Sequence, residues 1–134
     1  MAPKLLSVLR IVAAFLYLAH GTQKLLGVPG DSAPVTYLSL YGLAGLIESV
    51  GGTFILLGLF TRPVAIIAAA EMAVAYFLVH IRQGFWPLLN HGELAVLYCF
   101  LFLYIAVAGA GPWSLDRIRQ DRADLRTTGA RRFK

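Results

Sequence analysis

The stretch YLSLYGLAGLIESVGGTFILLGLF, residues Tyr37–Phe60, contains 24 residues and a single charged side chain, Glu48. As a helix it is long enough to cross a hydrocarbon core about 30 Å thick, which needs roughly 20 apolar residues. The whole chain shares this character, since 58% of its 134 residues are apolar, 14% are charged and the mean hydropathy is +0.70. A soluble domain has about 45–50% apolar and about 25% charged residues. The sequence therefore predicts a small all-α integral membrane protein.

Three more apolar runs flank this stretch, separated by segments rich in Gly and Pro. A transmembrane β-barrel would show alternating polar positions, which these runs lack. We therefore expect a four-helix transmembrane bundle over residues 1–113, followed by a basic tail at residues 114–134. The predicted spans are residues 5–26, 37–60, 63–81 and 93–111.

Positive charges predict the orientation. With four spans, ten of the twelve Lys and Arg residues lie on one side, and only Lys24 and Arg82 lie on the other. The positive-inside rule then places both termini in the cytoplasm. Lys4 and the apolar run after it loosely imitate a signal peptide, but we expect this span to stay uncleaved. The tail either lies against anionic headgroups or stays solvated, and we expect no nucleic-acid binding.

Each predicted span has polar or small residues along one helical face when residues are spaced at 100°. Ionisable residues inside a membrane are costly and usually face the bundle interior or a wet cavity. The pattern therefore predicts a bundle with a polar centre. Its polar members are Arg10, Tyr17, His20 and Lys24 in the first span, Tyr41 and Glu48 in the second, Glu71 and Arg82 in the third, and Glu93 and Tyr104 in the fourth.

Depth in the membrane suggests how these residues pair. Arg10 and Glu71 are expected within a few ångströms of the same depth, which predicts a buried ion pair. His20 is the expected partner of Glu48, while Lys24 extends outward to the surface. A Glu beside a His can hold a proton, bind a quinone carbonyl, or serve only as a structural hydrogen bond. These alternatives stay open, with Tyr17, Tyr41 and Tyr104 expected to line an apolar cleft.

A second polar group is expected at the outer mouth of the bundle, consisting of Lys24, His80, Arg82, His91 and Glu93. We predict no metal site there, because the side chains of His91 and Glu93 are too close in sequence to share a helix face. Loop hydrogen bonds, with Asn90 as the N-cap of the fourth span, are the expected role of this region.

The cysteine count and the absence of phosphate motifs narrow the chemistry. A single cysteine, Cys99, excludes an intrachain disulfide, a CxxC redox pair and a cysteine-rich zinc site. No strand–loop–helix pattern carries a Gly-rich phosphate loop, so nucleotide chemistry is not expected. The chain itself therefore offers no cofactor motif.

Four motifs follow one another in the sequence: H-G-x-x-K at His20–Lys24, E-x-x-G-G at Glu48–Gly52, G-L-x-T-R at Gly58–Arg62 and G-P-x-S-L-D at Gly111–Asp116. In this order and spacing the chain resembles the DoxX family of small bacterial membrane proteins. The resemblance implies a four-helix, multi-pass protein of the bacterial inner membrane. Some members of that family are linked to a thiosulfate:quinone oxidoreductase or to oxidative-stress defence. The family-like polar positions are Arg10, His20, Gly21, Lys24, Glu48, Arg62 and His80.

Three functions follow from these observations. The first is a quinone-interacting subunit of a sulfur-, thiol- or oxidative-stress-linked redox system, in which quinone or a partner subunit carries the electrons. The second is a non-catalytic membrane protein that assembles or anchors partners, and the third is a small proton-coupled transporter. The sequence leaves open whether the protein is an enzyme and whether it forms a homo-oligomer.

Overall fold

The computed structural model describes residues 1–30 and 33–131, and within those residues every regular element is a helix. The all-α prediction is therefore confirmed for this part of the chain. The elements are α1 (Ala2–Leu26), α2 (Leu40–Leu57), α3 (Thr61–Ala75), the π-helical turn η1 (Tyr76–His80), the 3-10 turn η2 (Ile81–Gln83), α4 (Glu93–Ala108) and α5 (Leu115–Arg131).

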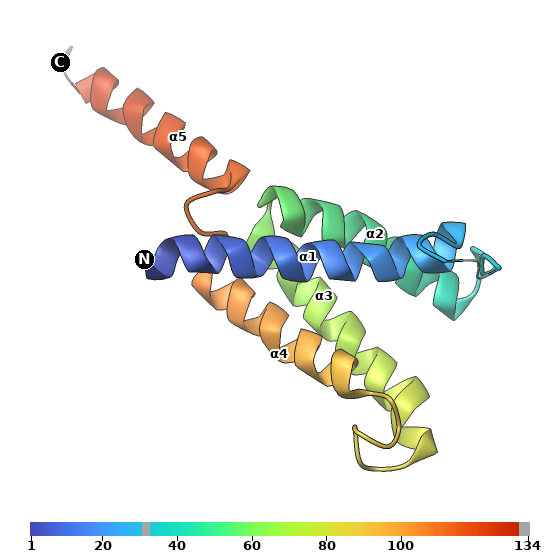
Figure 1. The fold of residues 1–134 in the computed structure, drawn as a ribbon. Coiled ribbons are helices and arrows are strands. Elements are labelled where there is room, and N and C mark those ends of the chain that lie inside the picture. The colour runs from blue at the N-terminus through green and yellow to red at the C-terminus, as the bar shows by residue number, and fades with distance from the viewer. Residues whose placement is uncertain (31–32, 132–134) are drawn as a thin grey trace.

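The helices form two pairs, α1 with α2 and α3 with α4, and α2 also contacts α3. Figure 1 shows that the pairs lie together near the N-terminus and diverge toward the connecting loops at the opposite end. We call the first end, around Arg10 and Gly58, the closed end, and the second, around Lys24 and Leu78, the open end. Helix α5 leaves the closed end and extends away from the bundle (Figure 1).

Three helical segments are long and apolar enough to cross a membrane: α1, α2 and the continuous segment Thr61–Gln83. Helix α4 is apolar but shorter, with 16 residues, or about 24 Å at 1.5 Å per residue. It ends before the predicted residue 111 because Gly109 turns the chain with φ 91°. That the chain crosses the membrane four times, and that both termini lie in the cytoplasm, stay predictions.

Local sequence explains where α2 begins and ends. Ser39 is its N-cap, and the Ser39 hydroxyl accepts a hydrogen bond from the Gly42 amide at 3.0 Å. The helix therefore begins three residues after the predicted Tyr37. At its other end Gly58 adopts the left-handed conformation, with φ 66°, which ends the helix and allows a tight turn into α3.

Glycines on α1 and α2 allow these two helices to approach closely. A Cβ added to Gly21 would lie 2.5 Å from the Ser49 nitrogen, and one added to Gly52 would lie 3.0 Å from the Leu18 Cα. Small residues at such positions let membrane helices gain van der Waals contact along their length. This close packing brings the polar side chains of α1 beside those of α2 at the open end.

Candidate functional site

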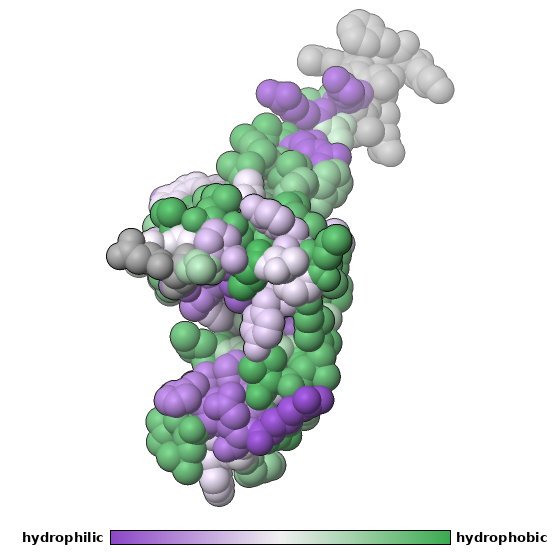
Figure 2. Space-filling view, turned by 90° about the vertical axis from the view of Figure 1, so that its right-hand side faces the viewer, coloured by the Kyte–Doolittle hydropathy of each residue, from purple (hydrophilic) through white to green (hydrophobic). Residues whose placement is uncertain are grey.

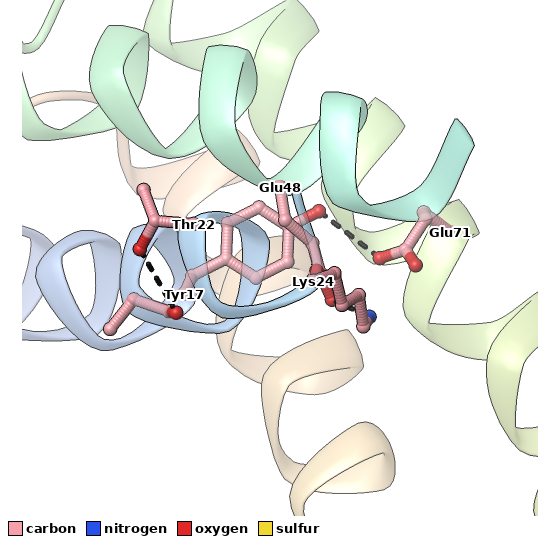
Figure 3. A network of polar contacts seen from close by, with 6 residues as sticks. Tyr17, Thr22, Lys24, Glu48 and Glu71 are labelled. Carbon is pink, nitrogen blue, oxygen red and sulfur yellow. Dashed lines mark hydrogen bonds and ion pairs between the residues drawn. The ribbon is translucent and has the colours of Figure 1, made fainter. Parts of the chain in front are cut away.

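Four polar side chains from three helices gather where the two helix pairs begin to diverge (Figure 3). Lys24 of α1 forms an ion pair with Glu48 of α2, with 2.6 Å between Nζ and Oε1. The Tyr17 hydroxyl of α1 donates a hydrogen bond to Glu71 Oε2 of α3 at 3.1 Å. These four residues, which we call the cleft cluster, connect both helix pairs.

Burial differs sharply within the cleft cluster. Glu48 is only 2% exposed and Tyr17 is fully buried, whereas the Lys24 side chain is 28% exposed and Glu71 is half-buried. The second carboxylate oxygen of Glu48, Oε2, is buried with no hydrogen-bond partner among the residues that the structure describes. A buried acceptor without a donor is costly, so this oxygen is a candidate position for a proton or for a donor from a ligand.

An apolar cavity of about 350 Å³ lies between α2 and α3 at the open end. Its polar lining side chains are Lys24, Tyr41 and Glu71, and the remaining lining residues are apolar. Figure 2 shows the molecule from this end, with apolar surface over most of it and smaller polar patches. The half-buried members of the cleft cluster therefore meet an apolar space that begins between the membrane helices.

A second apolar cavity, of about 400 Å³, continues toward the closed end between the same two helices. The two cavities share Ile47 of α2 and Ile67 of α3 in their linings. Val50 and Phe54 extend the second cavity along α2. Together the cavities form one apolar groove, which we call the α2–α3 groove, and its polar lining residues belong to the first cavity.

Aromatic rings fill the side of the cleft cluster that faces α4. The Tyr17 ring lies edge-on to Phe102 with 4.8 Å between centroids, and Tyr98 stacks on Phe102 at 5.6 Å. His20 packs edge-on to Tyr98 at 6.2 Å, and His20 itself is exposed. The ion pair of Glu48 is therefore formed with Lys24 and not with the predicted His20. Lys24 takes the place of His20, because Lys24 lies one turn farther along α1 and folds inward rather than toward the surface.

The predicted ion pair between Arg10 and Glu71 is also wrong. Arg10 is fully buried at the closed end, far along α1 from the cleft cluster. Its guanidinium donates hydrogen bonds to four backbone carbonyls, those of Ile55, Leu56, Ala110 and Trp113. The last carbonyls of a helix have no partner within the helix, and the five N–H donors of an arginine can satisfy several of them at once. Arg10 is thus a structural clamp.

Asp116, which the sequence did not single out, fastens the same end of the molecule. Its carboxylate accepts hydrogen bonds from the amides of Phe60 and Thr61, each at 2.9 Å, at the start of α3. Its own amide donates to the Gly58 carbonyl at 2.8 Å. The motifs G-L-x-T-R and G-P-x-S-L-D therefore contact each other, and their contact holds the α2–α3 turn against the start of α5.

Of the remaining tyrosines expected in the cleft, only Tyr41 lies there, where it lines the cavity. Tyr104 is 57% exposed and lines a different hollow at the closed end, so its predicted place is wrong. The buried face of α4 carries Tyr98, Phe102 and Ile105 instead. The predicted inward face of the fourth span, with Glu93 and Tyr104, is therefore wrong, because α4 is apolar on all sides and its buried face is an apolar one.

The residues expected at the outer mouth are engaged in loop structure or exposed. His80 Nδ1 donates to the Asn90 carbonyl at 3.0 Å. The buried Asn90 side chain donates to Gly84 and accepts from the Gly92 amide, so it organises the loop. The N-cap of α4 is Gly92 rather than the predicted Asn90. The remaining side chains of this group that lie in the loop region, those of Arg82, His91 and Glu93, are exposed. Within residues 1–30 and 33–131 no three His, Cys, Asp or Glu residues are grouped as metal ligands.

The fold and the cleft cluster together define a small helical membrane protein with a polar site beside an apolar groove. The chain belongs to the DoxX family, whose model matches residues 5–81.

Three relatives show how similar this chain is to other proteins. A Haemophilus influenzae protein is 46% identical over 122 residues, covering 85% of this chain and 90% of its own. The Escherichia coli "Inner membrane protein YqjF" is 31% identical, covering 83% and 88% of the two chains. The Bacillus subtilis "Putative oxidoreductase CatD" is 25% identical, covering 81% of each chain. No solved structure matches the chain with significance.

Proposed function

We propose that this protein binds a membrane quinone in the α2–α3 groove and serves as the quinone-interacting subunit of a redox system in the bacterial inner membrane. The observation that carries this proposal is the presence of Lys24 and Glu71 in the lining of an otherwise apolar groove. A quinone has the matching chemistry, because its ring carbonyls accept hydrogen bonds and the rest of the molecule is apolar. The name of the Bacillus subtilis relative, which includes the word oxidoreductase, supports a role in redox chemistry.

The groove offers a place for each part of the ligand. The cavity at the open end has about 350 Å³, within the range of small-molecule pockets, and suits a quinone ring. Lys24 and Tyr41, which line this cavity, would supply the donors to the ring carbonyls. The second cavity, past Ile47, suits the apolar chain of the quinone, which enters from the lipid between α2 and α3.

The cleft cluster supplies protons in this proposal. Reduction of a quinone to a quinol takes up two electrons and two protons. With a thiol as donor, two thiols form one disulfide and release two electrons and two protons, so the reaction balances. Glu48 acts through Lys24, and Glu71 acts beside the Tyr17 hydroxyl, as the groups that pass protons to the ring oxygens. A thiol compound or a redox partner subunit provides the electrons.

Direct binding measurements test this proposal. The full chain is reconstituted in nanodiscs, and the affinity for a short-chain benzoquinone is compared among wild type, Lys24→Met and Tyr41→Phe. We expect Lys24→Met to lose about tenfold in affinity and Tyr41→Phe about fivefold, because each variant loses one hydrogen-bond donor to a ring carbonyl. Tyr104→Phe, at the closed end, is the matched control and keeps wild-type affinity. Wild type binding no more quinone than empty nanodiscs would overturn the proposal, as would unchanged affinity in both cleft variants.

Assembly of partner proteins and proton-coupled transport stay predictions of the sequence.

A further inference from the structure

Helix α5 has two faces of different chemistry. At 100° per residue, one arc of about 120° combines apolar residues with arginines. The opposite arc holds Asp116, Gln120, Asp121 and Asp124. We call the first arc the basic–apolar face. Its members are Leu115, Ile118, Arg119, Arg122, Leu125 and Arg126.

The contacts of α5 determine which face points toward the bundle. A hollow separates α5 from the closed end, and the α5 residues that line it are Asp116, Arg117, Arg119, Gln120 and Ala123. Asp116 also accepts the two hydrogen bonds from the start of α3. The arc that holds Asp116 and Gln120 is therefore turned toward the bundle end, and Arg119 lies at the edge of the side that faces the bundle. The rest of the basic–apolar face is turned away from the bundle, with Ile118 48% and Leu125 74% exposed.

The first turns of α5 lie at the level where the membrane helices end. α5 starts at the closed end, held by the Asp116 amide on the Gly58 carbonyl at 2.8 Å. Trp113, half-exposed just before α5, is of the type enriched at membrane interfaces. Arg119 also stacks over the Phe60 ring in the α2–α3 turn, 4.7 Å from its centroid, which holds the first turns of α5 in place.

We propose that the basic–apolar face of α5 binds the anionic phospholipid surface of the membrane leaflet at the closed end. Charge complementarity carries this assignment, since the arginines of this face match anionic headgroups while the aspartates are turned away from them. The apolar side chains between the arginines insert among the headgroups, as in helices that lie in the membrane interface. The sequence left a solvated tail and a headgroup-bound tail open, and the sidedness of α5 favours the second.

A site-specific label tests this proposal in the full chain. In a Cys99→Ser background, one cysteine replaces Ile118 on the basic–apolar face or Gln120 on the arc that faces the hollow. An environment-sensitive fluorophore on each is exposed to an aqueous quencher in two kinds of nanodisc, phosphatidylcholine alone or mixed with phosphatidylglycerol. We expect protection of the label at position 118 in the anionic nanodiscs, reversed by salt. The label at position 120 stays accessible in both.

Charge variants make the test specific to one face. Each arginine near an anionic surface favours binding by about fivefold, so Arg122→Gln with Arg126→Gln lowers the partition of α5 onto the anionic bilayer by about 25-fold. Arg117→Gln, on the opposite arc, is the matched control and keeps the protection. Equal quenching at position 118 in both bilayers would overturn the proposal. Loss of protection in Arg117→Gln as large as in the double variant would overturn the assignment to this face.

Discussion

Replacement of Arg10 removes the only side chain among the described residues that donates to both the end of α2 and the segment after α4. In the structure its guanidinium donates to four carbonyls, including Ala110 at 2.8 Å and Leu56 at 2.6 Å. A net hydrogen bond contributes about 1 kcal/mol to stability, so four of them contribute about 4 kcal/mol. We therefore expect Arg10→Ala to lower the free energy of unfolding by about 4 kcal/mol.

Arg10→Lys separates the charge from the fork geometry of the guanidinium. A lysine keeps the positive charge, but its ammonium is a compact point charge with three donors and cannot reach all four carbonyls. We expect it to recover about half of the loss, roughly 2 kcal/mol, since about two hydrogen bonds are retained. Lys4→Ala, at an exposed position on the same helix, is the control and stays within about 0.5 kcal/mol of wild type.

The assay is reversible unfolding of the purified chain in mixed micelles with an increasing share of denaturing detergent, followed by circular dichroism. Tryptophan fluorescence reports in addition on the closed end, because Trp113 offers its carbonyl to Arg10. Unfolding of Arg10→Ala within about 1 kcal/mol of wild type would refute the clamp, since one hydrogen bond is worth that much. Full recovery by Arg10→Lys would refute the role of the fork geometry.

Three further predictions concern packing, the closed end and the loop before α4. Gly21→Ala places a Cβ 2.5 Å from the Ser49 nitrogen, so we expect a loss of about 1–3 kcal/mol in the same unfolding assay, and wild-type stability would contradict the close approach of α1 and α2. Asp116→Ala removes both hydrogen bonds to the start of α3 and lowers stability by about 1–2 kcal/mol, whereas Asp116→Asn, which keeps one acceptor, loses less. Asn90→Ala speeds amide hydrogen exchange in residues 84–92 and leaves quinone affinity unchanged, and a fall in affinity would place this loop in the site.

Apolar length and helix signals predict most of this fold. The spans around Glu48 and Tyr17 are continuous apolar runs, and their glycines mark the face on which α1 and α2 meet. The same periodicity placed Arg10, Tyr17 and Glu48 on inward faces, where the structure has them buried. These features depend on neighbours within one helix, which is why a single sequence reveals them.

Partners between helices were harder to predict, because depth along a span does not say which helix stands opposite. Arg10 was assigned to Glu71 by depth, but the free carbonyls at the end of α2 lie closer and suit its donors better. Lys24 pairs with Glu48 because the glycines bring α1 against α2. A helical wheel describes one helix at a time and does not show how closely two helices pack. Asp116 contacts Thr61, which lies 55 residues earlier in the sequence, and no local sequence pattern predicts a contact over such a separation.

Photo-crosslinking shows whether a quinone occupies the α2–α3 groove. The reconstituted chain is irradiated with a photoactivatable quinone analogue, and the labelled residues are identified by mass spectrometry of its peptides. We expect labels that are concentrated on Ile47, Ile67 and Val74, which line the groove, and that are displaced by excess unlabelled quinone. Labels of equal intensity on the exposed residues Leu97 and Phe100 of α4, or labels that excess quinone does not displace, would contradict it.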